Sequence, residues 1–348
     1  MEQVLSIEDI ARKTGLEESL LRYYESEYPS ELPKKVWHKS ALAFGAGAVE
    51  AFIRIHRHHS PVHDKVPFVD TRRFARVIAV TSGKGGVGKS NLALNLAIEL
   101  QRLGKMTVVL DADMGMANIH LLAGISPAKS IVEVLSGEER LTDIILEGPG
   151  GIGVIPGGAG ILALAYSTRS ERLKIIRAME QVESAAEIVV VDTAAGMSRG
   201  VREFLLAADE ILFVLTPDIT SLADAYGLLK ALHHEDLFLE RPIYSVINMV
   251  DTMKQAAGVA NRFSYCARRF LSREVQSAGY LLKDSTVGAA TARRTPYSIY
   301  KPDARVSRNT RRVAMILQQD EMPELRLTSA FGRYKKMLQT SEGPGLPQ

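Results

Sequence analysis

The segment SGKGGVGKSN, residues 82–91, places glycines, two lysines and a serine between two apolar stretches. The preceding stretch, RVIAVT, has the composition of a buried strand, and the following one, LALNLAIEL, has the spacing of a helix. Together they match the pattern G-x-x-x-x-G-K-[ST] of a phosphate-binding loop in its strand-to-helix context. The residues expected to contact a nucleotide are Gly83, Lys84, Gly85, Gly86, Val87, Gly88, Lys89, Ser90 and Asn91.

The chemistry of such a loop predicts binding of ATP with Mg²⁺. Glycines let consecutive backbone N–H groups turn toward one anion, and the helix adds its positive dipole end. We expect Lys89 to neutralise the terminal phosphates and the Ser90 hydroxyl to ligate Mg²⁺. One lysine is sufficient for this task, so Lys84 needs another explanation. Either it is a solvated loop charge, or it reaches across a two-fold axis to the phosphates of a second copy, so that ATP joins two copies.

Four polar residues at the ends of apolar runs extend the predicted site. Asp192 ends the run IVVVD, where its carboxylate could hold a water of the Mg²⁺ shell. Asp111 and Asp113 alternate in VVLDAD, so an extended chain would point both toward the ligand. We expect Asp113 to orient the attacking water and Asp111 to support it or the Mg²⁺ shell; alternatively one caps a turn and the other is solvated. Asn248 ends IYSVIN, and its amide could read an adenine edge.

The fold expected around these residues is α/β, with a mostly parallel sheet flanked by helices on both faces, preceded by a small helical domain. Seven apolar runs alternate with helical segments, and runs that are apolar on both faces are typical of parallel sheets covered on both sides. The predicted strands are residues 77–82, 108–113, 152–158, 187–194, 210–217, 243–249 and 279–284.

Composition and charge limit the class of protein. The 348 residues are 46% hydrophobic and 24% charged, with a net charge of +3. The single cysteine excludes an internal disulfide and sites that need paired cysteines, such as iron–sulfur clusters. No stretch is apolar enough for a membrane span or a signal peptide, so we expect a cytoplasmic protein. Basic residues crowd the C-terminal part: Arg293, Arg294, Arg305, Arg308, Arg311, Arg312, Lys335 and Lys336.

Four segments are expected along the chain: a helical module at 1–59, a linker at 60–75, the nucleotide-binding domain at 76–320, and an amphipathic segment with a polar tail at 321–348. In the first module, Ser6 can cap the helix IEDIARKT, Gly15 can end it, and EESLLRYYE can form a second helix. This arrangement resembles the helix-turn-helix of MerR-type proteins. Because acidic Glu17 and Glu18 stand where DNA contacts would be needed, both protein docking and DNA binding remain open.

The nucleotide-site motifs resemble a known family. KGGVGKS, LDADMGMANIHLLAG and VVDTAAGM are similar to the deviant phosphate-loop ATPases of the MinD/ParA group, and more narrowly to the flagellar-number ATPases FlhG and FleN. The resemblance implies slow, dimer-dependent ATP hydrolysis, in which Lys84 acts in trans, Lys89 in cis, Ser90 on Mg²⁺, Asp113 on water and Asp192 as the second acidic residue. The short DQA-containing activating segment of many FlhG proteins is not evident.

The C-terminal stretch LRLTSAFGRYKKMLQ, on a helix, would place Leu327, Phe331, Tyr334 and Leu338 on one face and basic residues on the other. Such a helix at residues 325–338 suits an anionic membrane, as in the MinD-like family, and implies reversible association with the inner membrane. The alternative is a terminal helix packed on the domain.

We therefore expect a switch ATPase that dimerises on ATP and controls flagellar number or placement, with itself, the membrane and flagellar proteins such as an FlhF-type GTPase or a flagellar regulator as partners. Two alternatives remain: a chromosome- or plasmid-partition ATPase that binds DNA through the C-terminal arginines, and an ATP-responsive transcriptional regulator that binds DNA through the N-terminal module.

Overall fold

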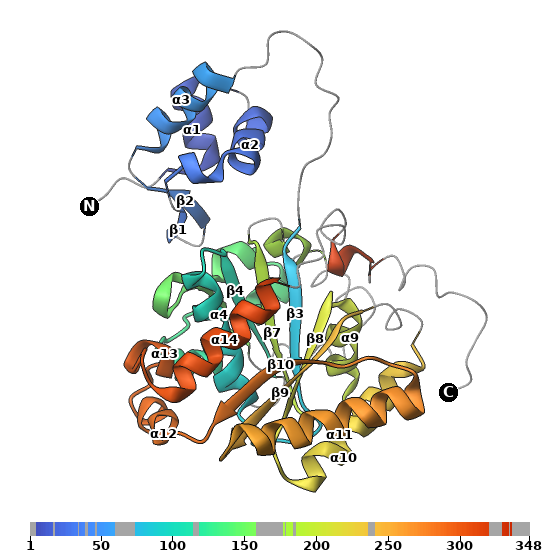
Figure 1. Ribbon diagram of the computed structural model, residues 1–348. Helices are drawn as coiled ribbons and strands as arrows, with labels where there is room; N and C mark the ends of the chain where they lie inside the picture. Colours follow the sequence, from blue (N-terminus) through green and yellow to red (C-terminus); the bar gives the residue numbers. More distant parts are fainter. Residues whose placement is uncertain are drawn as a thin grey trace, which may run out of the picture. The chain divides into compact units, whose positions relative to one another are not determined.

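The computed structural model describes residues 5–16, 18–33, 35–38, 41–45, 47–59, 74–113, 118–157, 177, 179–183, 186–235, 241–319, 329–333 and 335. The chain divides into two compact units, Met1–Arg73 and Phe74–Gln348, each with its own hydrophobic core (Figure 1). Most of the predicted linker lies outside the described residues. None of the described helices is long and apolar enough to cross a membrane.

The described part of the N-terminal unit consists of short helices and a hairpin. Ser6 caps the first helix by accepting from the Asp9 N–H, and Gly15 ends it in a left-handed conformation with φ of 72°, as predicted. The buried side chains of Ile10, Leu21 and Phe52 form part of the core. The elements are α1 (Ile7–Thr14), α2 (Glu18–Glu27), η1 (Pro29–Glu31), β1 (Lys35–His38), β2 (Ala41–Phe44) and α3 (Ala48–His59).

An eight-stranded sheet forms the centre of the second unit. Its order is β10-β9-β8-β3-β7-β4-β6-β5, and every neighbouring pair is parallel except β5 with β6. All seven predicted strands are present; the antiparallel edge strand β5 has only two residues, too few for a periodic signal. The strands are β3 (Arg76–Thr81), β4 (Thr107–Ala112), β5 (Leu146–Glu147), β6 (Gly153–Ile155), β7 (Ile188–Thr193), β8 (Glu210–Leu215), β9 (Ile243–Val250) and β10 (Gln276–Leu282).

Helices cover both faces of this sheet, which confirms the predicted fold class. Figure 1 shows α4 and α14 on one face and α10 and α11 on the other. Every residue of β3, β4, β7 and β8 is buried, as expected for strands enclosed on both sides. The helical elements are α4 (Lys89–Arg102), α5 (Ile119–Ala123), α6 (Ile131–Ser136), η2 (Leu141–Ile144), η3 (Pro149–Gly151), α9 (Arg199–Ala207), α10 (Ile219–His233), α11 (Met253–Leu271), α12 (Ser285–Ala292), α13 (Tyr297–Tyr300) and α14 (Arg305–Gln319).

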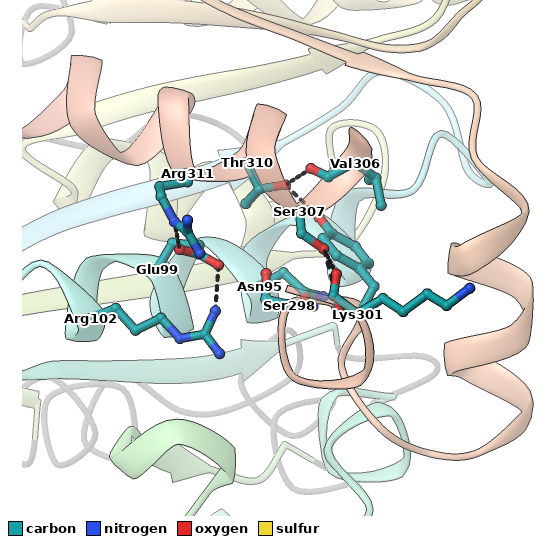
Figure 2. Close-up of polar contacts among 10 residues, drawn as sticks. Asn95, Glu99, Arg102, Ser298, Lys301, Val306, Ser307, Thr310 and Arg311 are labelled. Carbon is teal, nitrogen blue, oxygen red and sulfur yellow. Dashed lines mark hydrogen bonds and ion pairs between the residues drawn. The ribbon is translucent and has the colours of Figure 1, made fainter. Parts of the chain in front are cut away.

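A buried polar network ties α4 to α13 and α14 (Figure 2). The fully buried Glu99 carboxylate accepts from the Arg102 guanidinium at 2.8 Å and from the Arg311 guanidinium at 2.9 Å. One turn earlier on α4, Asn95 Oδ1 accepts from the backbone N–H of Ser298 at 2.8 Å. Because a buried charge is tolerated only when it is paired, these bonds hold α13 and α14 against the helix that begins at the phosphate loop.

Residues 329–333 of the C-terminal segment pack on the domain in this structure. Ala330 and Phe331 are buried, and the Phe331 ring meets Phe204 edge-on with 6.3 Å between ring centroids. The Glu183 carboxylate accepts from the backbone N–H groups of both residues, at 3.0 and 2.9 Å. Of the two arrangements considered for this segment, the described residues show the packed one. Leu327, Tyr334 and Leu338, which the amphipathic prediction also uses, lie outside the described side chains.

Charged side chains fasten the same segment. The Arg333 guanidinium contacts the Asp209 carboxylate, and Lys335 Nζ lies 2.9 Å from a carboxylate oxygen of Glu180. Burial raises the pKa of the Asp209 carboxyl, and the neighbouring Arg333 opposes this shift. Arg333 and Lys335, two of the basic residues predicted to face a membrane, are thus paired with acidic groups of the domain. Lys336 lies outside the described residues.

Candidate functional site

The phosphate loop connects the end of β3 to the start of α4. Gly86 and Gly88 have φ values of 78° and 85°, a region that L side chains rarely adopt. A Cβ on Gly83 would lie 2.2 Å from the backbone of Asp224 in α10, so only glycine fits there. These glycines let the loop wrap tightly, with Lys89 at the first position of α4, as predicted.

Lys89 and Asp192 form a buried ion pair beside this loop. Lys89 Nζ donates to Asp192 Oδ1 at 2.8 Å, and the two side chains are 7% and 1% exposed. Burial raises the pKa of the Asp192 carboxyl, and the Lys89 charge opposes that shift. The pair brings together the two residues that the sequence placed at the phosphates and at the Mg²⁺ shell.

The donor set around Asp192 fits a hydrated Mg²⁺ ion. Its second oxygen, Oδ2, is buried and has no hydrogen-bond partner among the described residues. The Ser90 hydroxyl lies close enough to the Asp192 carboxylate to lower its pKa. A carboxylate and a hydroxyl next to a phosphate loop are the oxygen groups that Mg²⁺ uses, directly or through water.

Asp111 lies on β4 directly beside Asp192 of β7, but its carboxylate binds backbone. Oδ2 accepts from the Ile119 N–H at 2.9 Å and Oδ1 from the Asp113 N–H at 3.2 Å, so Asp111 holds the end of β4 to the first residue of α5. Burial, and then the charge of Asp192, raise the pKa of Asp111 to about 7. The side chain is fully buried and is not among the residues that line the nucleotide cavity.

Asp113 lies outside β4 and half-buried, on the wall of a cavity of about 1110 Å³ that also contains the phosphate loop and Asn91. The two aspartates of the DAD sequence therefore have different surroundings: Asp111 holds the backbone, whereas Asp113 faces the space where a nucleotide would lie. This division matches the turn-capping alternative for Asp111 and leaves Asp113 placed for chemistry.

Lys84 is half-exposed at the opening of the same cavity. Its Nζ donates to Thr220 Oγ1 at 3.0 Å and to Asp218 Oδ1 at 3.3 Å, both at the start of α10. Hydrogen bonds from the Thr216 hydroxyl, first, and from Thr220 hold the pKa of Asp218 well below its usual range. Lys84 is thus held away from the buried Lys89 and Asp192 pair.

Asn248 contacts the phosphate loop itself. Its Nδ2 donates to the Val87 carbonyl at 2.8 Å, and its Oδ1 accepts from the Met249 N–H at 2.8 Å. The side chain also lines the cavity. Contact with an adenine edge stays a prediction, since in this structure the amide binds backbone at both ends.

Two parts of the site were not predicted from the sequence. The partners of Lys84, Asp218 and Thr220, follow β8, and only the strand order shows that β8 lies beside β3. Another wall of the cavity comes from the C-terminal third of the chain, where the sequence analysis assigned no nucleotide contact: Leu281, Leu282, Lys283, Asp284, Ser285, Val287, Thr291, Arg294, Tyr297 and Val306.

Comparisons with known proteins agree with this geometry. A family model described as an AAA domain matches residues 75–238. The antiactivator FleN of Pseudomonas aeruginosa is 34% identical over 215 residues, which cover 62% of this chain and 76% of FleN. The flagellum site-determining protein YlxH of Helicobacter pylori is 33% identical over 280 residues, which cover 78% of this chain and 93% of YlxH.

The chain belongs to the FleN/YlxH family of MinD/ParA-type ATPases. Solved structures of other proteins have the same fold as this FleN/YlxH-family ATPase. MinD from the MinC:MinD complex of Aquifex aeolicus matches with a TM-score of 0.59 and 22% identity over 72% of this chain and 98% of that one. MinD of Pyrococcus horikoshii, solved with Mg-ADP, matches with a TM-score of 0.58 and 19% identity over the same shares.

Proposed function

We propose that this FleN/YlxH-family ATPase is a dimerising switch that controls flagellar number or placement, with ATP and Mg²⁺ as its cofactors. The name of the flagellum site-determining protein YlxH points to flagellar control, and FleN is named as an antiactivator. The observation that carries the switch mechanism is the separation of two loop lysines: Lys89 is buried on Asp192, whereas Lys84 is half-exposed at the cavity opening. One lysine serves the bound phosphates, and the other is accessible to a second subunit.

In this mechanism the chain's own groups divide the work. The N–H groups of the loop and Lys89 bind the phosphates, and Asn91 lines the same cavity. Mg²⁺, when bound, neutralises phosphate charge, and Ser90 and Asp192 would hold it, with Asp111 supporting that shell from the neighbouring strand. Asp113 orients the water for attack on the terminal phosphate.

Peripheral membrane association is proposed through residues 325–338. In the structure Phe331 is buried and Arg333 is paired with Asp209, so this segment must leave the domain before it can bind a bilayer. The proposal therefore couples dimerisation to release of the segment, with reversible binding at the inner membrane.

The protein partners proposed are a second copy and a flagellar protein, such as an FlhF-type GTPase or a flagellar regulator. DNA is the alternative partner, either through the N-terminal module or through the C-terminal arginines. ATP-dependent binding to random DNA, but not to anionic liposomes, would favour the partition or regulatory alternative.

Light scattering of the Lys84→Ala protein with ATP and Mg²⁺ tests the switch. We expect nucleotide affinity within about threefold of the wild type, because Lys89 still serves the phosphates, but no ATP-dependent dimer. Lys230→Ala, which removes another exposed lysine, is the matched control and should dimerise normally. A dimer that still forms without Lys84 would contradict the trans role.

A further inference from the structure

The end of β9 has unusual backbone geometry next to the phosphate loop. Met249 has φ of 57°, the left-handed region that non-glycine residues rarely adopt. Its N–H donates to Asn248 Oδ1 at 2.8 Å, and this bond fixes the direction of the Asn248 amide. Strained residues of this kind persist where the surroundings hold them, often at ligand sites.

The fixed amide lies directly on the loop. Asn248 Nδ2 donates to the Val87 carbonyl at 2.8 Å, and a Cβ on Gly88 would lie 2.4 Å from the same nitrogen. Gly88 is therefore required for this close approach as well as for its φ of 85°. The phosphate loop and the end of β9 are therefore closely packed at this point.

This contact determines which way a loop amide points. In a trans peptide the C=O and the following N–H point in opposite directions, so a Val87 carbonyl held by Asn248 directs the Gly88 N–H away from Asn248. No acceptor for this N–H is present among the residues that the structure describes. Ser82 Oγ acts similarly at the other end, because it donates to the Lys84 carbonyl at 2.9 Å.

We propose that Asn248 is a positioning residue that orients the Gly88 N–H toward the phosphates. This inference deepens the proposed ATPase function and rests on it. The sequence did not predict this role, in which one N–H of the Asn248 amide binds the loop and its oxygen accepts from its own neighbour. Loss of Asn248 should then weaken binding of any polyphosphate, whatever base it carries.

The test compares Asn248→Ala with Asn118→Ala, a matched change on the same cavity. Affinities for ATP, GTP and inorganic tripolyphosphate, each with Mg²⁺, are measured by calorimetry. We expect Asn248→Ala to weaken all three by a similar factor, about tenfold, as for loss of one hydrogen bond that orients a charge-binding group. Asn118→Ala should change none of them by more than about twofold.

Asn248→Asp gives a more specific test, and it replaces Asn248→Ala if the alanine variant does not fold. Asp has the same shape but cannot donate to the Val87 carbonyl, so all three ligands should bind more weakly than to Asn118→Asp, which adds the same charge. A base-reading residue would behave differently: the change to Asp would favour GTP over ATP and leave tripolyphosphate no weaker than in Asn118→Asp.

If Asn248→Ala weakened the affinity for ATP but left the affinities for GTP and tripolyphosphate unchanged, the positioning role would be overturned. The adenine contact would then be the better account of Asn248. Failure of the proposed function can be distinguished from failure of the positioning role. In that case the wild-type protein itself would neither bind nor hydrolyse ATP.

Discussion

Both edges of the central sheet hold buried carboxylates, but Asp192 at the carboxyl-terminal edge is satisfied differently from Glu183 and Asp209 at the amino-terminal edge. At the amino-terminal edge, both oxygens of Glu183 accept backbone N–H groups, and Asp209 accepts from the Val77 N–H while it pairs with Arg333. At the carboxyl-terminal edge, backbone N–H groups satisfy Asp111 in the same way as Glu183. Asp192 beside it pairs with Lys89 through one oxygen, and its other oxygen is buried without a partner among the described groups.

This difference distinguishes carboxylates that stabilise packing from a carboxylate that can bind a ligand. A carboxylate with all its hydrogen bonds satisfied within the chain stabilises packing and gains little from a ligand. A buried oxygen that lacks a partner costs free energy until something binds it, and a cation with its waters can do so. The carboxyl edge is thus suited to ligand binding, and the amino edge to holding the C-terminal segment.

The largest effect is expected at the carboxyl edge from Lys89→Ala. This change removes the phosphate-binding cation and leaves the buried Asp192 unpaired, so ATP turnover should fall at least about 1,000-fold. A malachite-green phosphate assay measures it. Turnover near the wild-type rate would mean that the nucleotide site lies elsewhere.

Asp113→Ala should lower turnover by about 300-fold, because water is no longer oriented while the phosphate contacts survive. The ATP-bound dimer should therefore accumulate, which size-exclusion chromatography with ATP and Mg²⁺ can measure. If hydrolysis continues unchanged, the water-orienting role belongs to another residue.

The comparison between the edges is tested by paired changes. Asp192→Asn should lower turnover about 100-fold, since it weakens both the Lys89 pair and the proposed Mg²⁺ shell. Asp209→Asn should leave turnover within about threefold but lower the free energy of unfolding by about 1–3 kcal/mol, because Arg333 loses its charged partner. If Asp192→Asn and Asp209→Asn lowered turnover equally, the proposed difference between the two edges would be wrong.

The smallest effect concerns pH. Burial raises the pKa of Glu183 to about 7, above the usual 4.5, so the folded protein retains a proton that the unfolded chain releases. The free energy of unfolding should therefore fall as pH rises from about 5 to 7, with Glu183 contributing at most about 1.4 kcal/mol per pH unit.

Glu183→Gln cannot titrate and should make this slope shallower. Urea unfolding followed by far-ultraviolet circular dichroism is suitable, because the single tryptophan, Trp37, reports only on the N-terminal unit. An unchanged slope would show that other buried carboxyls, such as Asp111 and Asp209, carry the pH dependence.

Much of this site followed from the sequence because its signals are local. The pattern around Lys89 combines a strand, a glycine-rich turn and a helix within a short stretch, and its backbone geometry leaves few alternatives. Asp192 could be placed because a polar residue after a buried parallel strand must lie at the carboxyl edge. Local pattern assigned Asp111 and Asp113 different roles, but it could not show that Asp111 binds backbone, since that contact depends on Ile119, which starts the next helix.

The sequence by itself determined the fold class, the loop, the family and the segment of the chain that binds phosphate, because spacing and local backbone preference encode them. Only the tertiary structure decided which distant groups meet that segment. Strand order puts Asp218 beside Lys84 and Asn248 on Gly88, and packing buries Phe331 on Phe204. Such contacts join residues about 120–160 positions apart, and no periodicity within one segment can specify them.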